Sequence, residues 1–274
     1  MKKFLFAILA LVMVLALAAC GSQPTEPADD GDDGDTADTA SLTYAVEAGS
    51  AGEEIANELG YSINSVGSQA DALMEVAAGT SDAAIIDLLM AGAMIGEGTS
   101  YPNLIWTESL TTEEYGVGCR QDSDLADCIN AVFAEAYADG SMADLAAQYG
   151  ISADVIIEQP AVDEFVAIEG GDVAYIIEKG TLVVGITDFA PMDYKDDNGN
   201  WIGFDADMAR IVAEKLGVEV QFIEIDWDNK IMELESKNID VVWNGMTLTG
   251  EVMGAMNCTN AYFENAQVIV KPAD

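Results

Sequence analysis

The segment Gly-Ser-Ala-Gly-Glu at residues 49–53 carries groups that could bind a small anion. It joins an expected strand to an expected helix, and free backbone N–H groups at a helix start can hold a carboxylate or another anion. Ser50, followed three residues later by Glu53, also fits a capping box, in which each side chain satisfies a backbone donor. Anion binding and helix capping therefore both explain these residues.

Catalytic and metal chemistry find little support elsewhere in the chain. There is no histidine, which removes His-based general base catalysis, Ser-His triads and His-ligated zinc. The four cysteines form no Cys-x-x-Cys pair or other metal-ligand spacing. We therefore expect no catalytic residue, no metal site and no cofactor, and a function based on binding.

The first 41 residues indicate where the protein works. A basic start and an apolar run from Phe4 to Ala19 are typical of a secretory signal peptide at residues 1–19. Leu-Ala-Ala-Cys, ending at Cys20, resembles the bacterial lipobox, which implies lipidation of the Cys20 sulfur; an uncleaved anchor or an ordinary signal peptide is the alternative. Residues 21–40 hold seven acidic and no basic residues, so residues 20–41 are expected to form a solvated tether at the extracytoplasmic face of the bacterial cell membrane.

Three cysteines remain after Cys20, and an exported protein can pair an even number of them. Cys119 is expected to end a strand, and Cys128 to lie on the inner face of the next helix. We expect a Cys119–Cys128 disulfide that leaves Cys258 free, with three buried thiols as the alternative.

Composition limits the partners. About 230 residues follow the tether, enough for one large or two modest domains, and half of all residues are hydrophobic. The net charge of −39 argues against binding to nucleic acid and against adhesion to anionic lipid through basic patches. Membrane attachment is therefore expected only through Cys20.

Strand and helix patterns alternate in two regions, which predicts βαβ units and parallel sheets. An amphipathic helix over 124–138 ends the first region, and a bridge with Pro160 and Gly170-Gly171 separates the two. The first region has expected strands at 42–47, 61–66, 83–87 and 103–106 and helices at 50–59 and 69–78. The second has strands at 182–186, 218–225 and 239–243 and helices at 205–216 and 230–236.

Several motifs carry a resemblance to one family. In the second region these are Gly-Ile-Thr-Asp-Phe-Ala-Pro-Met from 185, Gly-Phe-Asp-Ala-Asp from 203, Ile-Asp-Trp-Asp from 225 and Asp-Val-Val-Trp-Asn-Gly-Met-Thr from 240. Their order and spacing resemble the polar amino-acid-binding family of bacterial extracellular solute-binding proteins of ABC transporters. Motifs from 45, 81, 115 and 138 resemble that family's second lobe, return strand and last helices. The resemblance implies an α/β, two-lobed periplasmic-binding-protein-like fold of type II, circularly permuted behind a lipoprotein signal.

The resemblance also implies domain boundaries. Residues 42–112 would form lobe 2, residues 113–150 the return strand and C-terminal helices packing on lobe 1, residues 151–179 a splice linker, and residues 180–274 lobe 1. The reversed order would leave a single covalent hinge around 111–116. We therefore expect looser lobe motion than in an unpermuted relative.

The same resemblance implies a ligand site between the lobes. Phe189 and Trp227 would supply aromatic walls, with core packing as the alternative for each. Asp87 would pair with a ligand ammonium, or else simply cap the helix that begins at Leu88. The other implied contacts come from two segments. One segment follows an expected strand, where a turn leading to a helix capped by Thr249 is the alternative: Asn244, Gly245, Met246 and Thr247. The other starts the helix after residue 49: Ser50, Ala51 and Gly52.

Two departures from the family pattern bear on the ligand. Val252 stands where the family usually has an arginine that clamps a carboxylate, and Ala51 replaces a hydroxyl. A carboxylate would therefore rely on helix-start N–H groups, Asn244 and Thr247. The expected ligand is a small polar amino acid or related amine.

The resemblance implies a receptor that delivers its ligand to the permease of an ABC importer. A ligand-sensing module for a signalling partner is one alternative. A dehydratase-like enzyme on the same fold is another, disfavoured by the absence of histidine and of a nucleophile–base pair.

Overall fold

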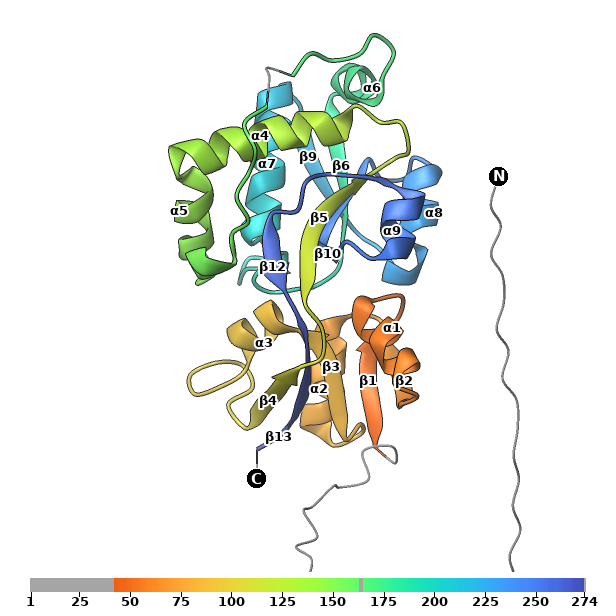
Figure 1. Cartoon of the computed structure of the whole chain (residues 1–274), viewed down its shortest axis with the longest axis vertical. Helices are drawn as coiled ribbons and strands as arrows, with labels where there is room; N and C mark the ends of the chain where they lie inside the picture. The colour runs from red at the N-terminus through yellow and green to blue at the C-terminus, as the bar shows by residue number, and fades with distance from the viewer. Residues whose placement is uncertain (1–41, 163–164, 274) are drawn as a thin grey trace, which may run out of the picture. The chain divides into compact units, whose positions relative to one another are not determined.

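The computed structural model describes residues 42–162 and 165–273. The signal peptide, Cys20 and the tether expected from the sequence lie outside these residues. Within the part of the chain that is described, no helix is both long and apolar enough to cross a membrane. These residues fold into two lobes, each built around one mixed sheet (Figure 1).

The small lobe takes strands from both ends of the described chain. Its elements are β1 (Thr43–Glu47), α1 (Ala51–Glu58), β2 (Ser62–Val66), α2 (Gln69–Ala78), β3 (Ala83–Asp87), α3 (Leu88–Met94), β4 (Leu104–Ser109) and β13 (Gln267–Pro272). The strand order is β2-β1-β3-β13-β4, with β1 parallel to β2 and β3, and β13 antiparallel to β3 and β4. Every residue of β3 is buried, as expected of a central strand covered on both faces.

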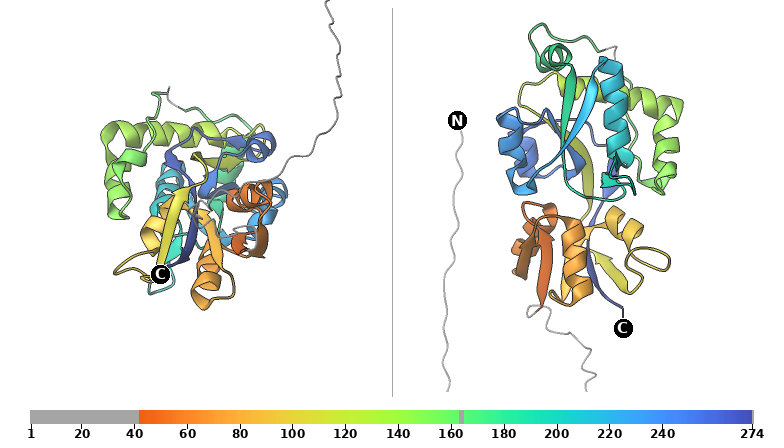
Figure 2. Two further views of the ribbon diagram at one scale, coloured as in Figure 1. Left: turned by 60° about the horizontal axis from the view of Figure 1, so that its bottom comes forward. Right: turned by 180° about the vertical axis from the view of Figure 1, so that it is seen from behind.

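The large lobe contains the rest of the described chain. Its sheet has the order β11-β5-β10-β6-β9, and β12 also pairs with β5. Figure 2 shows α7 beside β6 and β9 when the molecule is seen from behind. The elements are β5 (Glu113–Cys119), α4 (Leu125–Asp139), α5 (Ser141–Gln148), the 3-10 helix η2 (Ala153–Val155), α6 (Asp172–Lys179), β6 (Thr181–Ile186), β7 (Tyr194–Lys195), β8 (Trp201–Ile202), α7 (Phe204–Leu216), β9 (Glu219–Glu224), the 3-10 helix η3 (Trp227–Asn229), α8 (Lys230–Glu235), β10 (Val241–Thr247), α9 (Gly250–Ala255), β11 (Asn257–Cys258) and β12 (Phe263–Asn265).

Two covalent connections cross between the lobes. One joins β4 to β5, and the other joins β12, which pairs with β5, to β13, which lies between β3 and β4. Figure 1 shows these two connections running side by side. The prediction of a single hinge is therefore wrong, and residues 267–272 belong to the small lobe instead of the lobe expected for 180–274.

The bridge between the two regions is integrated into the large lobe. Ile156 forms an isolated β-bridge with Phe263, and the Asp172 carboxylate lies 2.9 Å from Nε of Arg120. The Asp124 carboxylate accepts hydrogen bonds from the backbone N–H groups of Ile168 and Val173, both at 2.9 Å. The second half of the expected splice linker thus anchors α6 against the start of α4.

The cysteines do not pair as expected. Cys119 ends β5 and Cys128 lies on α4, where the sequence placed them, but both are free thiols, as is Cys258. Cys119 is fully buried at the end of its strand, whereas Cys128 lines a groove with Phe165 and Lys215. Burial raises the pKa of the Cys128 thiol to about 11. The Cys119–Cys128 disulfide prediction is wrong because the two side chains pack in different surroundings.

Candidate functional site

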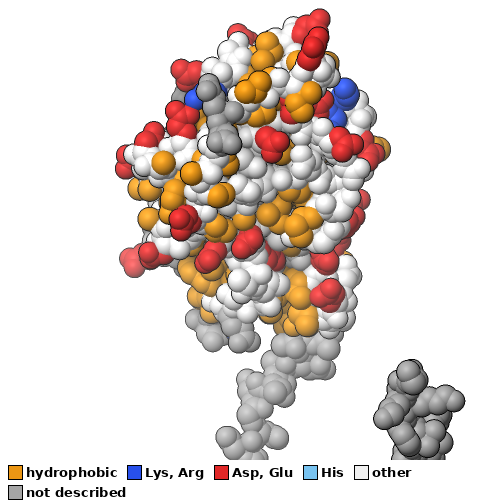
Figure 3. Space-filling view, turned by 45° about the horizontal axis from the view of Figure 1, so that its top comes forward, with side chains coloured by type: hydrophobic (Ala, Val, Ile, Leu, Met, Phe, Trp, Pro, Cys, Tyr) orange, Lys and Arg blue, Asp and Glu red, His pale blue; other side chains and the backbone are white. Residues whose placement is uncertain are grey.

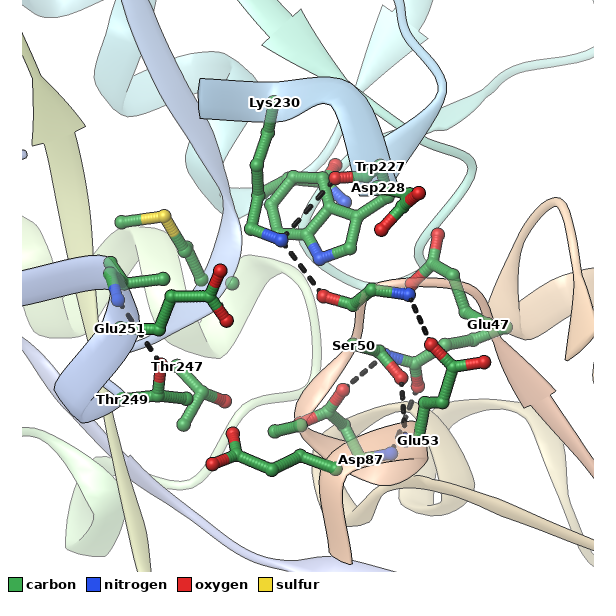
Figure 4. Close-up of a pocket in the computed structure, with 18 of the residues that line it drawn as sticks. Glu47, Ser50, Glu53, Asp87, Trp227, Asp228, Lys230, Thr247, Thr249 and Glu251 are labelled. Atoms are coloured by element: carbon green, nitrogen blue, oxygen red, sulfur yellow. Dashed lines mark hydrogen bonds between the residues drawn. The ribbon is translucent and has the colours of Figure 1, made fainter. Parts of the chain in front are cut away.

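A cavity of about 300 Å³ lies between the lobes, where three strands end. β1 and β3 reach it from the small lobe through Glu47 and Asp87, and β10 reaches it from the large lobe through Thr247. Ligands of open α/β sheets bind outside the carboxyl ends of strands. Figure 4 shows side chains from both lobes facing this space.

Eight of the ten ligand contacts predicted from the sequence line this cavity. The structure therefore brings together residues separated by nearly two hundred positions in the chain. Their role as ligand contacts stays a prediction. The eight residues are Ser50, Ala51, Asp87, Trp227, Asn244, Gly245, Met246 and Thr247.

The other two residues lie elsewhere. Phe189 is 1% exposed and packs edge-on against Tyr115, with ring centroids 6.3 Å apart. The Phe189 ring also fills the space beside Gly245, whose φ is +55°. Phe189 therefore belongs to the core, the alternative given for it. Gly52 lies in the first turn of α1, where an added Cβ would be 3.0 Å from the carbonyl oxygen of Ile85. A ligand contact through the Gly52 N–H stays a prediction.

Side chains of the same segment cap backbone N–H groups at the start of α1. The Ser50 hydroxyl accepts from the N–H of Glu53 at 3.1 Å, and the Glu53 carboxylate accepts from the N–H of Gly49 at 2.8 Å. This capping box confirms the structural interpretation of the segment. The two bonds occupy donors that an anion would otherwise use.

Asp87 is buried in a set of carboxamides. Its carboxylate accepts hydrogen bonds from the side-chain amides of Gln69, Asn265 and Gln267, the last at 3.0 Å. Asp87 occupies the N-cap position of α3, as the alternative expected, but its side chain makes no capping bond to the helix. Burial, followed by the nearby charge of Glu113, raises the pKa of Asp87 to about 7.

Glu47 was not predicted as a site residue. It ends β1 at the cavity, is 2% exposed, and its Oε1 has no hydrogen-bond partner among the described residues. Burial raises its pKa to about 8, against a smaller opposing effect of a hydrogen bond with Thr187. Thr187 is held by Asn244, whose side-chain amide donates to the Thr187 hydroxyl at 2.8 Å.

Lys230 connects the two lobes and was also missed. Its Nζ donates to the Gly49 carbonyl of the small lobe at 2.8 Å and to the Trp227 carbonyl at 3.3 Å. Gly49 has φ +70°, and an added Cβ would lie 2.7 Å from Cα of Asp228. The backbones of the two lobes therefore meet at a glycine, and Figure 4 shows the Lys230 bonds that join them.

Known proteins resemble the second half of the chain. Residues 182–274 match the bacterial extracellular solute-binding proteins, family 3. A solved structure of the arginine-bound domain 1 from TmArgBP, in its Phe57Trp mutant, is 36% identical; the match covers 84% of that chain and 36% of this one, with a TM-score of 0.33. Over residues 182–274 the chain therefore resembles this family.

Curated relatives show the same partial coverage. The arginine-binding extracellular protein ArtP of Bacillus subtilis is 33% identical over 97 residues, 35% of this chain and 38% of the relative. The L-cystine-binding protein TcyJ of Escherichia coli K12 is 31% identical over 124 residues, 44% and 46% of the respective chains. A cyclohexadienyl dehydratase of Pseudomonas aeruginosa is 32% identical over 77 residues, 28% of this chain and 29% of the relative. The chain thus spans less than half the length of the curated relatives that it matches.

Acidic groups predominate among the ionisable residues of this cavity. Figure 3 shows that Asp and Glu also outnumber Lys and Arg over one face of the surface. Val252, 4% exposed, lines the cavity at the position where the sequence comparison expected an arginine. The ionisable lining residues are one lysine, Lys230, and six acids: Glu47, Glu53, Glu54, Asp87, Asp228 and Glu251.

Proposed function

We propose that this chain captures a small polar amino acid or related amine between its lobes and delivers it to the permease of an ABC importer. The observation that carries the proposal is the cavity between the lobes, at the carboxyl ends of β1, β3 and β10. The lobes join through two strand connections, an arrangement suited to closing around a ligand. Several relatives are amino-acid-binding proteins.

A thermal-shift screen over amino acids and amines tests this proposal. A ligand that binds the folded state raises the melting temperature as its concentration exceeds its Kd. We expect at least one compound to do so, and we expect Asp87→Asn to remove the shift. Asp82→Asn, the same change at an exposed residue just before β3, is the matched control. The absence of any stabilising compound, together with no ligand retained on purification, would contradict the proposal.

We further propose that the protein is anchored to the membrane through lipidated Cys20. The support is the sequence, in which Leu-Ala-Ala precedes Cys20 after an apolar run, and acyl chains can hold a protein at a bilayer surface. Metabolic labelling with palmitate is expected to mark the wild-type chain and to leave Cys20→Ala unlabelled. An unlabelled wild type overturns the anchor.

The proposal describes a binding protein and not an enzyme. Most of the relatives are binding proteins, although one of them is a cyclohexadienyl dehydratase. The carboxylates at the cavity adjoin no histidine, since the chain has none. Recovery of an unchanged ligand after prolonged incubation with the protein is the expected result.

A further inference from the structure

Several groups that could bind a ligand carboxylate are already used within the protein. The N–H groups of Gly49 and Glu53 donate to the capping box of α1. The N–H of Val252 donates to the Thr249 hydroxyl at 3.3 Å, and its side chain is apolar. A carboxylate that bound at these three N–H groups would displace existing bonds without finding an arginine fork to replace them.

The cation of the cavity is also engaged. Lys230 Nζ donates to two backbone carbonyls, those of Gly49 and Trp227, and lies 5.1 Å from the centroid of the Trp227 ring. Turning this ammonium toward a carboxylate would break the link between the lobes that closes the cavity. Lys230 thus serves the closed state instead of an anionic ligand.

Glu47 differs from Lys230 because one of its hydrogen-bond acceptors has no donor. Its Oε1 is buried at the cavity and has no hydrogen-bond partner within residues 42–162 and 165–273. Leaving a buried acceptor unsatisfied costs free energy that a ligand donor would recover. An ammonium or guanidinium group supplies both the missing donors and the complementary charge.

Acids on both walls give the cavity two places for positive charge. Glu47 and Asp87 come from the ends of small-lobe strands, while Asp228 and Glu251 come from η3 and α9 of the large lobe. Figure 4 shows these carboxylates on different sides of the space. The volume of about 300 Å³ lies at the lower end of the range for small-molecule sites.

We infer that the ligand is a small diamine or guanidinium amine, with two positive charges and no carboxylate, and that Glu47 determines this specificity. The inference rests on the proposed function and narrows its ligand class. One cationic group would bind Glu47, and the other would lie near Asp228 and Glu251. The carboxylate of an amino acid would meet this acidic lining without a free cation.

Matched pairs of compounds test the inference by isothermal titration calorimetry on the full chain. The pairs are agmatine with arginine, putrescine with ornithine, and cadaverine with lysine, each differing by one carboxylate. We expect the decarboxylated member of at least one pair to bind at least tenfold more tightly. If the amino acid binds as tightly or more tightly in every pair that binds, the inference is overturned while the proposed function stands. If no amine and no amino acid binds, the proposed function fails.

The role of Glu47 has its own test. Glu47→Gln keeps the shape of the side chain and removes its charge, so it is expected to lower affinity for the best diamine at least tenfold. It is also expected to abolish the preference for that diamine over a monoamine of equal length, a ratio that a merely structural role would not change. Glu178→Gln, at an exposed position on α6, removes the same charge and is expected to leave both values unchanged. Wild-type affinity and preference in Glu47→Gln would overturn the assignment.

Discussion

Glu47 and Asp87 bring carboxylates to the cavity from the small lobe, and Lys230 brings its one cation from the large lobe. Asp87 could be located from its sequence because it ends an apolar strand, a position that faces the edge of the sheet. Glu47 ends a strand in the same way, but it offered no motif and looked like an ordinary strand end. Lys230 was missed because its function depends on Gly49, 181 positions away in the chain. Contacts between such distant residues are set by packing, which local patterns do not describe.

Phe189 shows the opposite failure. An aromatic residue before Ala-Pro in a loop suggested an exposed ring, yet the ring is buried against Tyr115 and Gly245. The missing Cβ at residue 245 leaves the space that the ring fills. The packing of the Phe189 ring against Gly245 cannot be predicted from either residue alone.

Glu47 predicts a pH dependence of ligand binding. Its pKa is raised to about 8 by burial, with Asp87, Lys230 and Asp71 as the charged groups that also act on it. A cationic ligand favours the ionised carboxylate, so affinity is expected to rise as the pH increases from about 6 to 9. Without ligand, the raised pKa of Glu47 affects the stability of the folded state in the opposite direction. The folded state keeps a proton on Glu47 that the unfolded chain releases. The resulting contribution to stability is lost as the pH rises through about 8.

Calorimetric titrations across this pH range measure the effect. Glu47→Gln is expected to flatten the pH profile, because it removes the carboxyl that titrates. Glu178→Gln is expected to keep the wild-type slope. An affinity for the amine that does not change between these pH values argues against a contact with Glu47.

At the scale of elements, the sequence predicted the helices and central strands well, but it did not predict which strands pair with one another. The expected amphipathic helix over 124–138 corresponds to α4, and its apolar face is buried. The strand at 267–272 has no feature that assigns it to one sheet, and it pairs with β3 and β4. Strand alternation predicts which residues face a core, but not which sheet the strand joins.

The close approach of α1 and η3 predicts a matched pair of glycine substitutions. Gly49→Ala would place a Cβ 2.7 Å from Cα of Asp228, whereas Gly60→Ala, at a similar φ of +73°, meets nothing within 4 Å. Both changes put an alanine in the left-handed region and are expected to lower the free energy of unfolding by about 1 kcal/mol. Only Gly49→Ala is expected to weaken ligand binding, because only it obstructs contact between the lobes.

Urea unfolding and ligand titration of both variants separate the two effects. Equal ligand affinities in Gly49→Ala and Gly60→Ala, at equal stability, would show that the contact between Gly49 and Asp228 does not contribute to binding.

For the molecule as a whole, the two crossing connections change what a reversed order of the halves would imply. The expectation of looser lobe motion depended on a single hinge, and it loses its basis once β12 and β13 form a second connection. We still propose that the halves are circularly permuted. The support is that the small-lobe strands β1 to β4 come first in the chain, while the segment that matches the family, residues 182–274, comes last.

A rearranged chain tests this proposal. β13 is antiparallel to β3, and β1 is parallel to β3, so the end of β13 and the start of β1 lie at the same end of the small-lobe sheet. A short flexible linker between them, with new termini at the Gln159–Pro160 bond, restores the order in which the large-lobe strands β6, β9 and β10 come first and keeps both crossing connections. Because every sheet pairing is preserved, we expect the rearranged chain to fold with a similar melting temperature and to keep the ligand preference of the wild type. A rearranged chain that is unfolded would show that the present order is needed to build the lobes; a folded chain with a different ligand preference would show that the order of the halves shapes the cavity itself.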